Sequence, residues 1–126
     1  MPASDEQMLA SVEAYIENFN KADFKAIAGL YAANATVEDP IGTPIKDGND
    51  AIRDFYEGAV QTGSQLALAG PVRIAGQEAA FAFVVSVETP DAKMTIDVID
   101  TMAFDDDGKI IKMRAFWGEK NVSVIS

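Results

Sequence analysis

One carboxyl side chain in the stretch KMTIDVIDTMAFD stands where a strand would be expected to carry a hydrocarbon. Successive side chains of a strand point to opposite faces, and the alternate positions from Met94 to Phe104 are apolar except for Asp100. The pattern therefore predicts a buried face that contains Asp100 and an exposed face that contains Asp97. A buried acid that stays protonated can donate a hydrogen bond at neutral pH. A structural Asp, satisfied by backbone amides or a turn, is the alternative.

Two further residues have side chains suited to proton transfer or hydrogen-bond donation. Tyr15 lies in the apolar stripe of a predicted helix, so its hydroxyl should point inward, where a phenol needs a partner. Asp39 precedes Pro40, which biases Asp39 towards extended backbone. In isolation, Asp39 can be a turn residue or a catalytic carboxylate, and Tyr15 can be a core aromatic residue.

The residue inventory limits the chemistry that the chain can perform. The sequence contains no His and no Cys, which excludes thiolate nucleophiles, Ser-His triads, and metal sites built from imidazole or thiolate. Proton transfer must then use Asp, Glu, Tyr or Lys. The nine glycines are dispersed and form neither GxGxxG nor GxxxxGK[ST]. We expect neither a metal nor a cofactor.

Length and charge indicate the class of protein. The 126 residues, 48% hydrophobic and 24% charged, suit a single globular domain over residues 1–126. Twenty acidic and ten basic residues give a net charge of -10, which argues against nucleic acid and anionic membranes as partners. No apolar run approaches the ~20 residues of a membrane helix. The start, MPASDEQ, lacks the features of a secretory signal, so a cytoplasmic location is expected.

Three helices are predicted in the N-terminal half of the chain. The first begins at a capping box of Ser4 and Gln7, the second is capped by Asp23 and ends near Asn34, and the third covers residues 49–62. Their inward positions are Met8, Val12, Tyr15, Ile16 and Phe19 in the first helix, Phe24, Ile27, Leu30 and Tyr31 in the second, and Ile52, Phe55, Tyr56 and Val60 in the third.

From Leu66 onward the apolar spacing is that of strands. A Gly70-Pro71 pair interrupts the first strand region, and an acidic turn at residues 105–108 precedes the last strand. The predicted inward positions are Leu66, Leu68, Val72 and Ile74, then Phe81, Phe83, Val85 and Val87, and finally Ile111, Met113, Ala115 and Trp117.

Helices followed by strands indicate an α+β fold, in which the helices pack on one face of a strongly curved, mostly antiparallel sheet. Such a sheet can close over the helices into a cone that holds a small apolar ligand. The residues expected to line this pocket are Phe19, Phe55, Phe81, Phe83, Val85, Ile96, Val98, Met113 and Trp117.

Several segments resemble the ketosteroid isomerase (steroid Δ5-isomerase) family of the NTF2-like or SnoaL-like superfamily. They are AYIENF around Tyr15, LYAANATVEDPIG around Asp39, AIRDFYEG, GPVR, TIDVIDTMAFDDDGKI and MRAFWGEKN, in order across nearly the whole chain. Residues 61–69 match poorly. The resemblance implies an NTF2-like cone-shaped roll and a cofactor-independent isomerisation of 3-oxo-Δ5-steroids to 3-oxo-Δ4-steroids.

The resemblance also implies roles for individual residues. Asp39 would be the general base that carries a proton from C4 to C6, while Tyr15 and Asp100 would donate hydrogen bonds to the dienolate oxygen. Tyr31 and Tyr56 fall where the family can have a supporting tyrosine network. The family is itself a known example of a carboxylic acid kept neutral by an apolar site. Family members are homodimers joined through their sheets, and their ligands are apolar steroids.

Two other classes of function stay open. One is a different enzyme on the same fold, such as an epoxide hydrolase, a dehydratase or a polyketide cyclase, since these also use pocket carboxylates and tyrosines. The other is a non-catalytic module that binds a small ligand, in which Tyr15, Asp39 and Asp100 would be unrelated structural residues.

Overall fold

The first helix, α1 (Asp5–Asn20), begins where the sequence predicts. Ser4 Oγ accepts a hydrogen bond from the Gln7 amide at 3.1 Å, and Gln7 Oε1 accepts one from the Ser4 amide at 2.8 Å. This reciprocal capping satisfies two amide groups at the start of the helix. The buried residues of α1 are Met8, Val12, Tyr15 and Phe19, and burial of an apolar side chain of this size contributes about 1.5–3 kcal/mol.

The computed structural model describes residues 2–125; Met1 and Ser126, the ends of the predicted domain, lie outside the described residues. The other helices are α2 (Phe24–Ala28) and α3 (Asn49–Val60). The strands are β1 (Tyr31–Glu38), β2 (Lys46–Asp47), β3 (Gln65–Leu68), β4 (Arg73–Ala75), β5 (Glu78–Glu88), β6 (Lys93–Phe104), β7 (Ile110–Phe116) and β8 (Val122–Ile125), with a 3₁₀ turn η1 (Glu119–Asn121) before β8.

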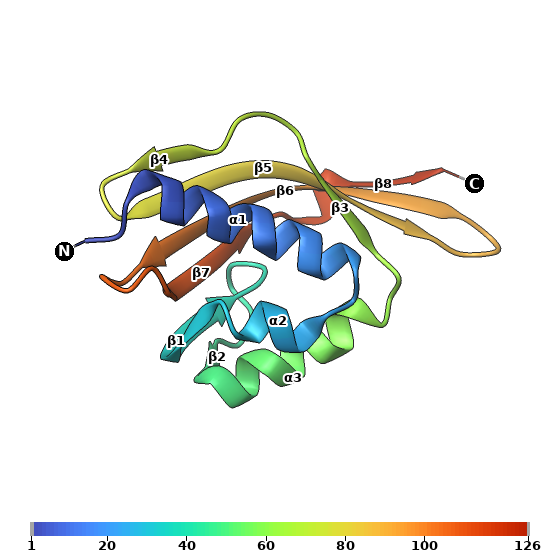
Figure 1. The fold of residues 1–126 in the computed structure, drawn as a ribbon. Coiled ribbons are helices and arrows are strands. Elements are labelled where there is room, and N and C mark those ends of the chain that lie inside the picture. Colours follow the sequence, from blue (N-terminus) through green and yellow to red (C-terminus); the bar gives the residue numbers. More distant parts are fainter. Residues whose placement is uncertain (1, 126) are drawn as a thin grey trace.

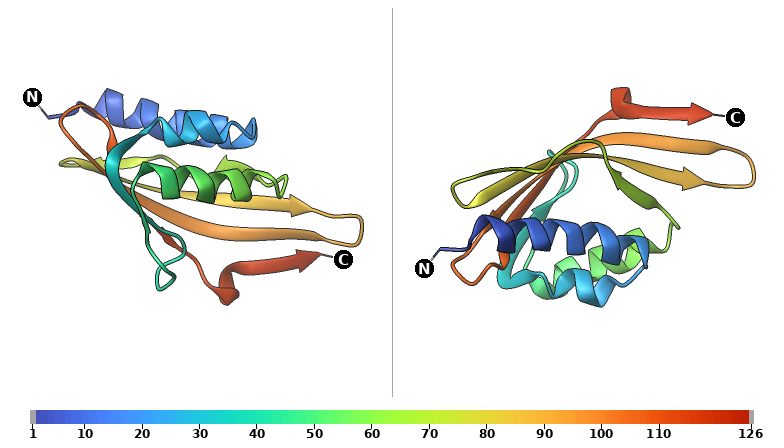
Figure 2. Two further views of the ribbon diagram at one scale, coloured as in Figure 1. Left: turned by 90° about the horizontal axis from the view of Figure 1, so that it is seen from below. Right: turned by 45° about the horizontal axis from the view of Figure 1, so that its top comes forward.

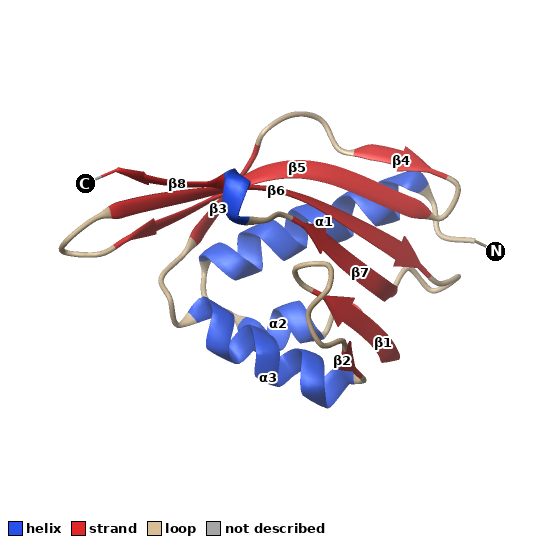
Figure 3. Cartoon of the chain, turned by 180° about the vertical axis from the view of Figure 1, so that it is seen from behind, coloured by secondary structure: helices blue, strands red, loops and turns tan. Residues whose placement is uncertain are grey.

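The strands form one curled, unclosed sheet in the order β2-β1-β7-β6-β5-β3, with β4 paired to β5 and β8 paired to β6. All pairs are antiparallel except β1 with β7. The three helices lie together on one face of the sheet (Figures 2 and 3). Helix α3 packs against β1 and β2, α1 packs against β3, β4 and β5, and α2 lies between the two longer helices (Figure 1). The predicted α+β fold is confirmed.

The second predicted helix is wrong beyond its first turns. Asp23 caps α2 as expected, but α2 ends at Ala28, and Tyr31 to Glu38 form strand β1. Leu30, Tyr31 and Asn34 were expected in the helix. Over so short a stretch, the apolar spacing suits a helix and a strand equally well. The segment becomes a strand because the backbone of Thr36 and its neighbours pairs in parallel with β7.

The alternation in β6 is confirmed. Val98, Asp100, Met102 and Phe104 are buried, whereas Asp97 is exposed. Asp100 lies opposite Phe81 of β5 and Ala115 of β7. The carboxyl group is therefore held between two central neighbours in the sheet, on the face that the helices cover.

The inward phase of the last strand is wrong at its start. Ile110 is fully buried and Ile111 is 38% exposed, the reverse of the prediction, whereas Met113 and Ala115 are buried as expected. The pairing of β6 with β7 shifts register between Ala103 and Phe104, and such an irregularity moves one residue to the opposite face. Leu68, also predicted to face inward, is exposed on β3, and α3 ends at Val60, before residue 62.

Candidate active site

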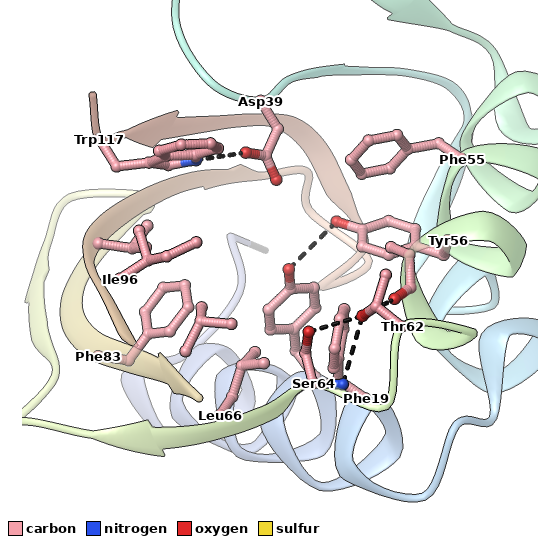
Figure 4. Close-up of a pocket in the computed structure, with 14 residues that line it drawn as sticks. Phe19, Asp39, Phe55, Tyr56, Thr62, Ser64, Leu66, Phe83, Ile96 and Trp117 are labelled. Atoms are coloured by element: carbon pink, nitrogen blue, oxygen red, sulfur yellow. Dashed lines mark hydrogen bonds between the residues drawn. The ribbon is translucent and has the colours of Figure 1, made fainter. Parts of the chain in front are cut away.

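A cavity of about 250 Å³ opens between the helices and the inner face of the sheet (Figure 4). Its volume is near the lower end of the range for small-molecule sites. Most of its wall is apolar and comes from α1, α3, β3, β5 and β6. The polar side chains on its wall are Tyr15, Asp39, Tyr56, Thr62, Ser64 and Trp117.

Three buried tyrosines form a chain of hydroxyl groups beside the cavity. Tyr56 donates a hydrogen bond to the Tyr15 hydroxyl at 3.4 Å, and the hydroxyls of Tyr31 and Tyr56 are 2.7 Å apart. Because the single proton of Tyr56 is used towards Tyr15, Tyr31 must be the donor to Tyr56. The Tyr15 proton is then free for a group in the cavity. Burial is the main cause that raises the pKa of all three phenols well above the usual value, so they remain neutral donors.

Asp100 lies behind the cavity wall and is 1% exposed. Neither carboxyl oxygen has a hydrogen-bond partner among residues 2–125. Burial, and secondarily the charge of Asp39, raises the pKa of Asp100 well above its ordinary value of 3.8. A neutral acid without a partner is an available donor, because an unsatisfied buried polar group gains free energy when a partner arrives. Asp100 also raises the pKa of Tyr15 electrostatically.

Asp39 reaches the cavity from the loop after β1. Trp117, just after β7, donates its indole N–H to Asp39 Oδ1 at 3.0 Å. Burial raises the pKa of Asp39, while the Trp117 hydrogen bond and the Lys46 charge oppose that rise. The Asp39 carboxyl therefore has a pKa that suits a general base better than a fully exposed carboxyl would.

The loop that carries Asp39 is fixed at several points. The amide of Ile41 donates to the Ala115 carbonyl of β7 at 2.9 Å, and the amide of Gly42 donates to Glu38 Oε2 at 2.9 Å. Thr43 Oγ1 donates to the Pro40 carbonyl at 2.7 Å. These bonds hold Asp39 against the end of β7, where Trp117 is placed.

The structure brings most of the predicted lining residues to the cavity. The predicted residues on its wall are Phe19, Phe55, Phe83, Val85, Ile96, Val98 and Trp117. The other two, Phe81 and Met113, share the inward face of the sheet but belong to the core. The Phe81 ring packs between those of Tyr15 and Phe83, at centroid distances of 6.4 and 5.5 Å. The catalytic roles of Tyr15, Asp39 and Asp100 remain predictions.

Four lining residues were not identified from the sequence: Ala59, Thr62, Ser64 and Leu66. They lie where α3 ends and β3 begins, and all but Ala59 fall within residues 61–69, which match the family poorly. One signal was present, because Ser64 shares the alternation phase of Leu66 and so should face inward with it.

The structure also bears on a metal site and on a membrane-spanning helix. Residues 2–125 contain no cluster of three or more acidic side chains placed to bind a metal ion. Every helix within the described part of the chain is too short or too polar to cross a membrane. The expected absence of metal and cofactor, and the cytoplasmic location, stay predictions.

The curled sheet, its helical cover and the mostly apolar cavity between them are the features expected of a SnoaL-like domain. The family profile described as "SnoaL-like domain" matches residues 12–113, which is most of the chain. The chain therefore belongs to the SnoaL-like family, and the superfamily predicted from the sequence is confirmed.

Individual relatives carry different activities. The chain is 37% identical over 118 residues to the steroid Δ-isomerase of Nocardioides simplex, an alignment that covers 94% of this chain and 95% of that protein. It is 26% identical over 149 aligned positions to the epoxide hydrolase LasB of Streptomyces lasalocidi, covering 98% of this chain and 52% of that protein. A solved structure of SalBIII, an epoxide hydrolase/cyclase-like enzyme in pyran ring formation in salinomycin, is similar with a TM-score of 0.88 and 28% identity, covering 96% of this chain and 98% of that one.

Proposed function

We propose that this protein isomerises 3-oxo-Δ5-steroids to 3-oxo-Δ4-steroids. The observation that supports the proposal most is a carboxyl group, Asp39, and a phenol with a free proton, Tyr15, on the wall of one mostly apolar cavity, together with a buried acid without a partner, Asp100, outside that wall. The steroid Δ-isomerase of Nocardioides simplex, similar over nearly the full length of both chains, supports the same activity.

The reaction needs one base and two donors. Asp39 removes a proton from C4, and the electrons of the C–H bond move into the conjugated system, so that negative charge develops on the C3 oxygen. Tyr15 and Asp100 donate hydrogen bonds to that oxygen and stabilise the dienolate. Asp39 then returns the same proton to C6, the carbonyl re-forms, and the new double bond lies between C4 and C5.

The tyrosine chain supports the donor role of Tyr15. Tyr56 donates to the Tyr15 oxygen and Tyr31 to that of Tyr56, so each phenol strengthens the next as a donor. Within this chain the proton of Tyr15 is the one that is not used for another tyrosine. No ionised tyrosine is required.

A second candidate is epoxide opening, which the likeness to SalBIII and LasB favours. Asp39 could activate a water molecule or a substrate hydroxyl, and Tyr15 could donate to the epoxide oxygen. A neutral Asp100 suits either reaction, because an epoxide oxygen also becomes negative when its C–O bond breaks. The isomerase is preferred because the similarity to the steroid Δ-isomerase is higher and covers nearly the full length of both chains.

Ultraviolet absorbance tests the proposal, since the Δ4-3-oxo product is a conjugated enone and the Δ5 substrate is not. We expect the purified protein to convert 5-androstene-3,17-dione to the 4-ene product. Conversion of an epoxide to a diol without any steroid isomerisation would support the second candidate instead. Steroid binding without turnover would indicate a non-catalytic binding module.

A further inference from the structure

A pair of hydroxyl groups lies on the cavity wall across from the proposed base. Figure 4 shows Thr62 and Ser64 on the opposite side of the pocket from Asp39 and Trp117. Ser64 is 8% exposed and, apart from the tyrosines, it and Asp100 are the buried polar or charged residues among residues 2–125. The proposed isomerisation uses neither hydroxyl.

The neighbouring groups determine which hydroxyl of this pair donates and which accepts. Thr62 Oγ1 donates its single proton to the Ala59 carbonyl at 2.8 Å, because a carbonyl can only accept. The Oγ atoms of Thr62 and Ser64 are 2.6 Å apart, so Ser64 must be the donor in that contact. The Ser64 proton is therefore occupied, and its oxygen lone pairs remain available towards the cavity.

The backbone around Ser64 is held in place from α1. Asn20 Nδ2 donates to the Leu66 carbonyl at 2.9 Å, and the Leu66 amide donates to Asn20 Oδ1 at 2.7 Å. The Ser64 amide also donates to Thr62 Oγ1 at 3.3 Å. These bonds make Ser64 Oγ a positioned hydrogen-bond acceptor in an otherwise mostly apolar wall.

We propose that Ser64 is a specificity-determining residue that accepts a hydrogen bond from a hydroxyl group on the substrate. The inference rests on the proposed isomerase function and names its substrate class: steroids with a hydroxyl, rather than a ketone, at the end remote from the reacting ring. The rigid ring system holds its C3 oxygen at Tyr15 and C4 and C6 near Asp39. Its other end must then contact a different part of the wall, and Ser64 supplies the acceptor there.

A ketone in the same place is disfavoured because it presents a second acceptor to Ser64 Oγ. It could be accommodated only if Ser64 turned its proton away from Thr62, which breaks the existing hydrogen bond. The expected preference is modest, roughly 2- to 10-fold, as for one hydrogen bond between neutral groups.

The test compares kcat/KM for 5-androstene-3,17-dione and its 17β-hydroxy analogue in three proteins. The wild type should prefer the 17β-hydroxy steroid by roughly 2- to 10-fold. In Ser64→Ala the preference should disappear, through a loss confined to the hydroxylated substrate. Thr62→Val keeps the branched shape but frees the Ser64 proton. In this variant kcat/KM for the 17-ketone should rise, and the preference for the 17β-hydroxy steroid should fall or reverse.

A purely structural role for these residues would lower kcat/KM for both steroids alike in both variants, and that result would overturn the inference. A wild-type ratio near one that Ser64→Ala does not change would also overturn it, while leaving the isomerase function intact. Ser64→Ala could fold poorly, and the Thr62→Val comparison then decides the question by itself.

A binding measurement separates failure of this inference from failure of the proposed function. Trp117 is the single tryptophan of the chain and lines the cavity, so its fluorescence should report ligand binding. The 4-ene products, one with a 17β-hydroxyl and one with a 17-ketone, bind without reacting. Tighter binding of the hydroxylated product, lost in Ser64→Ala, would support the role of Ser64 even if no isomerisation occurred. Binding of neither product would overturn both proposals.

Discussion

The indole nitrogen of Trp117 donates a hydrogen bond to Asp39 Oδ1 at 3.0 Å, and this bond joins the end of β7 to the loop after β1. The bond favours the ionised form of Asp39, whereas burial favours the neutral form. Lys46 adds a second effect in favour of the ionised form. The Trp117 hydrogen bond and the Lys46 charge thus both oppose the effect of burial on the pKa of the proposed base.

Removal of the Trp117 hydrogen bond should shift the pH dependence of activity. In Trp117→Phe, burial raises the pKa of Asp39 with less opposition, so the acidic limb of kcat/KM should move to higher pH. The sign follows because only ionised Asp39 accepts a proton. A pH profile of steroid isomerisation measures the limb, with Phe24→Leu as an aromatic control outside the cavity. A limb that stays in place or moves to lower pH would count against Asp39 as the base.

The two proposed oxyanion donors should respond differently to substitution. Asp100→Asn keeps a donor of similar size and should lose much less activity than Asp100→Ala. Loss of one preorganised donor usually costs about 2.7–4 kcal/mol in the transition state, or roughly 10²–10³-fold in kcat. Tyr15→Phe should fall in the same range, and the two losses should not add fully because both donors serve one oxygen. Wild-type activity in Asp100→Ala would remove Asp100 from the mechanism.

Asp100 should also make stability depend on pH. Its pKa is raised in the folded state above the ordinary value of 3.8, so the folded protein holds a proton that the unfolded chain releases. Stability should therefore fall as pH rises from about 4 through the raised pKa. Asp100→Asn removes this penalty, so its Tm advantage over wild type should grow between pH 5 and pH 8. Asp97→Asn, on the exposed face of the same strand, is the control; an advantage independent of pH would contradict a neutral Asp100.

We expect a homodimer joined through the outer face of the sheet. That face carries exposed apolar side chains, Ile99 at 50% and Phe116 at 42% exposure, which line a hollow together with Val84 and Asp97. Light scattering at micromolar concentration should give about twice the chain mass of 13.5 kDa. Phe116→Asp should give a monomer, while Ile111→Asp, at similar exposure outside the hollow, should not. A 13.5 kDa species for the wild type would contradict the expectation.

The elements that could be predicted from the sequence are those with a strong local pattern. The capping box fixes the start of α1, and the alternation in β6 is long enough to place Asp100 inside and Asp97 outside. Strand β1 was missed because its alternation is short and Ala-rich, and its structure depends on pairing with the distant strand β7. The inversion at Ile110 and Ile111 depends on a register shift that no local spacing encodes.

The site was predictable to a similar extent. Residues on regular strand faces, such as Val85 and Ile96, reach the cavity as predicted, whereas Phe81 lies deeper in the core because depth along a face is set by the helices packed on it. Thr62 and Ser64 were missed because they lie in a turn between α3 and β3. The hydrogen bonds between Thr62 and Ser64 fix their side chains, and the only signal in the sequence was the alternation phase that Ser64 shares with Leu66.

The most direct test is the rate of conjugated-enone formation from 5-androstene-3,17-dione, measured side by side for the wild type and Asp39→Asn. The wild type should isomerise the steroid. Asp39→Asn should still bind it, by Trp117 fluorescence, yet lose at least the ~10²–10⁴-fold that a general base contributes, because neither His nor Cys exists to replace the carboxylate. No enone from the wild type, or equal rates for the two proteins, would contradict the proposed isomerase.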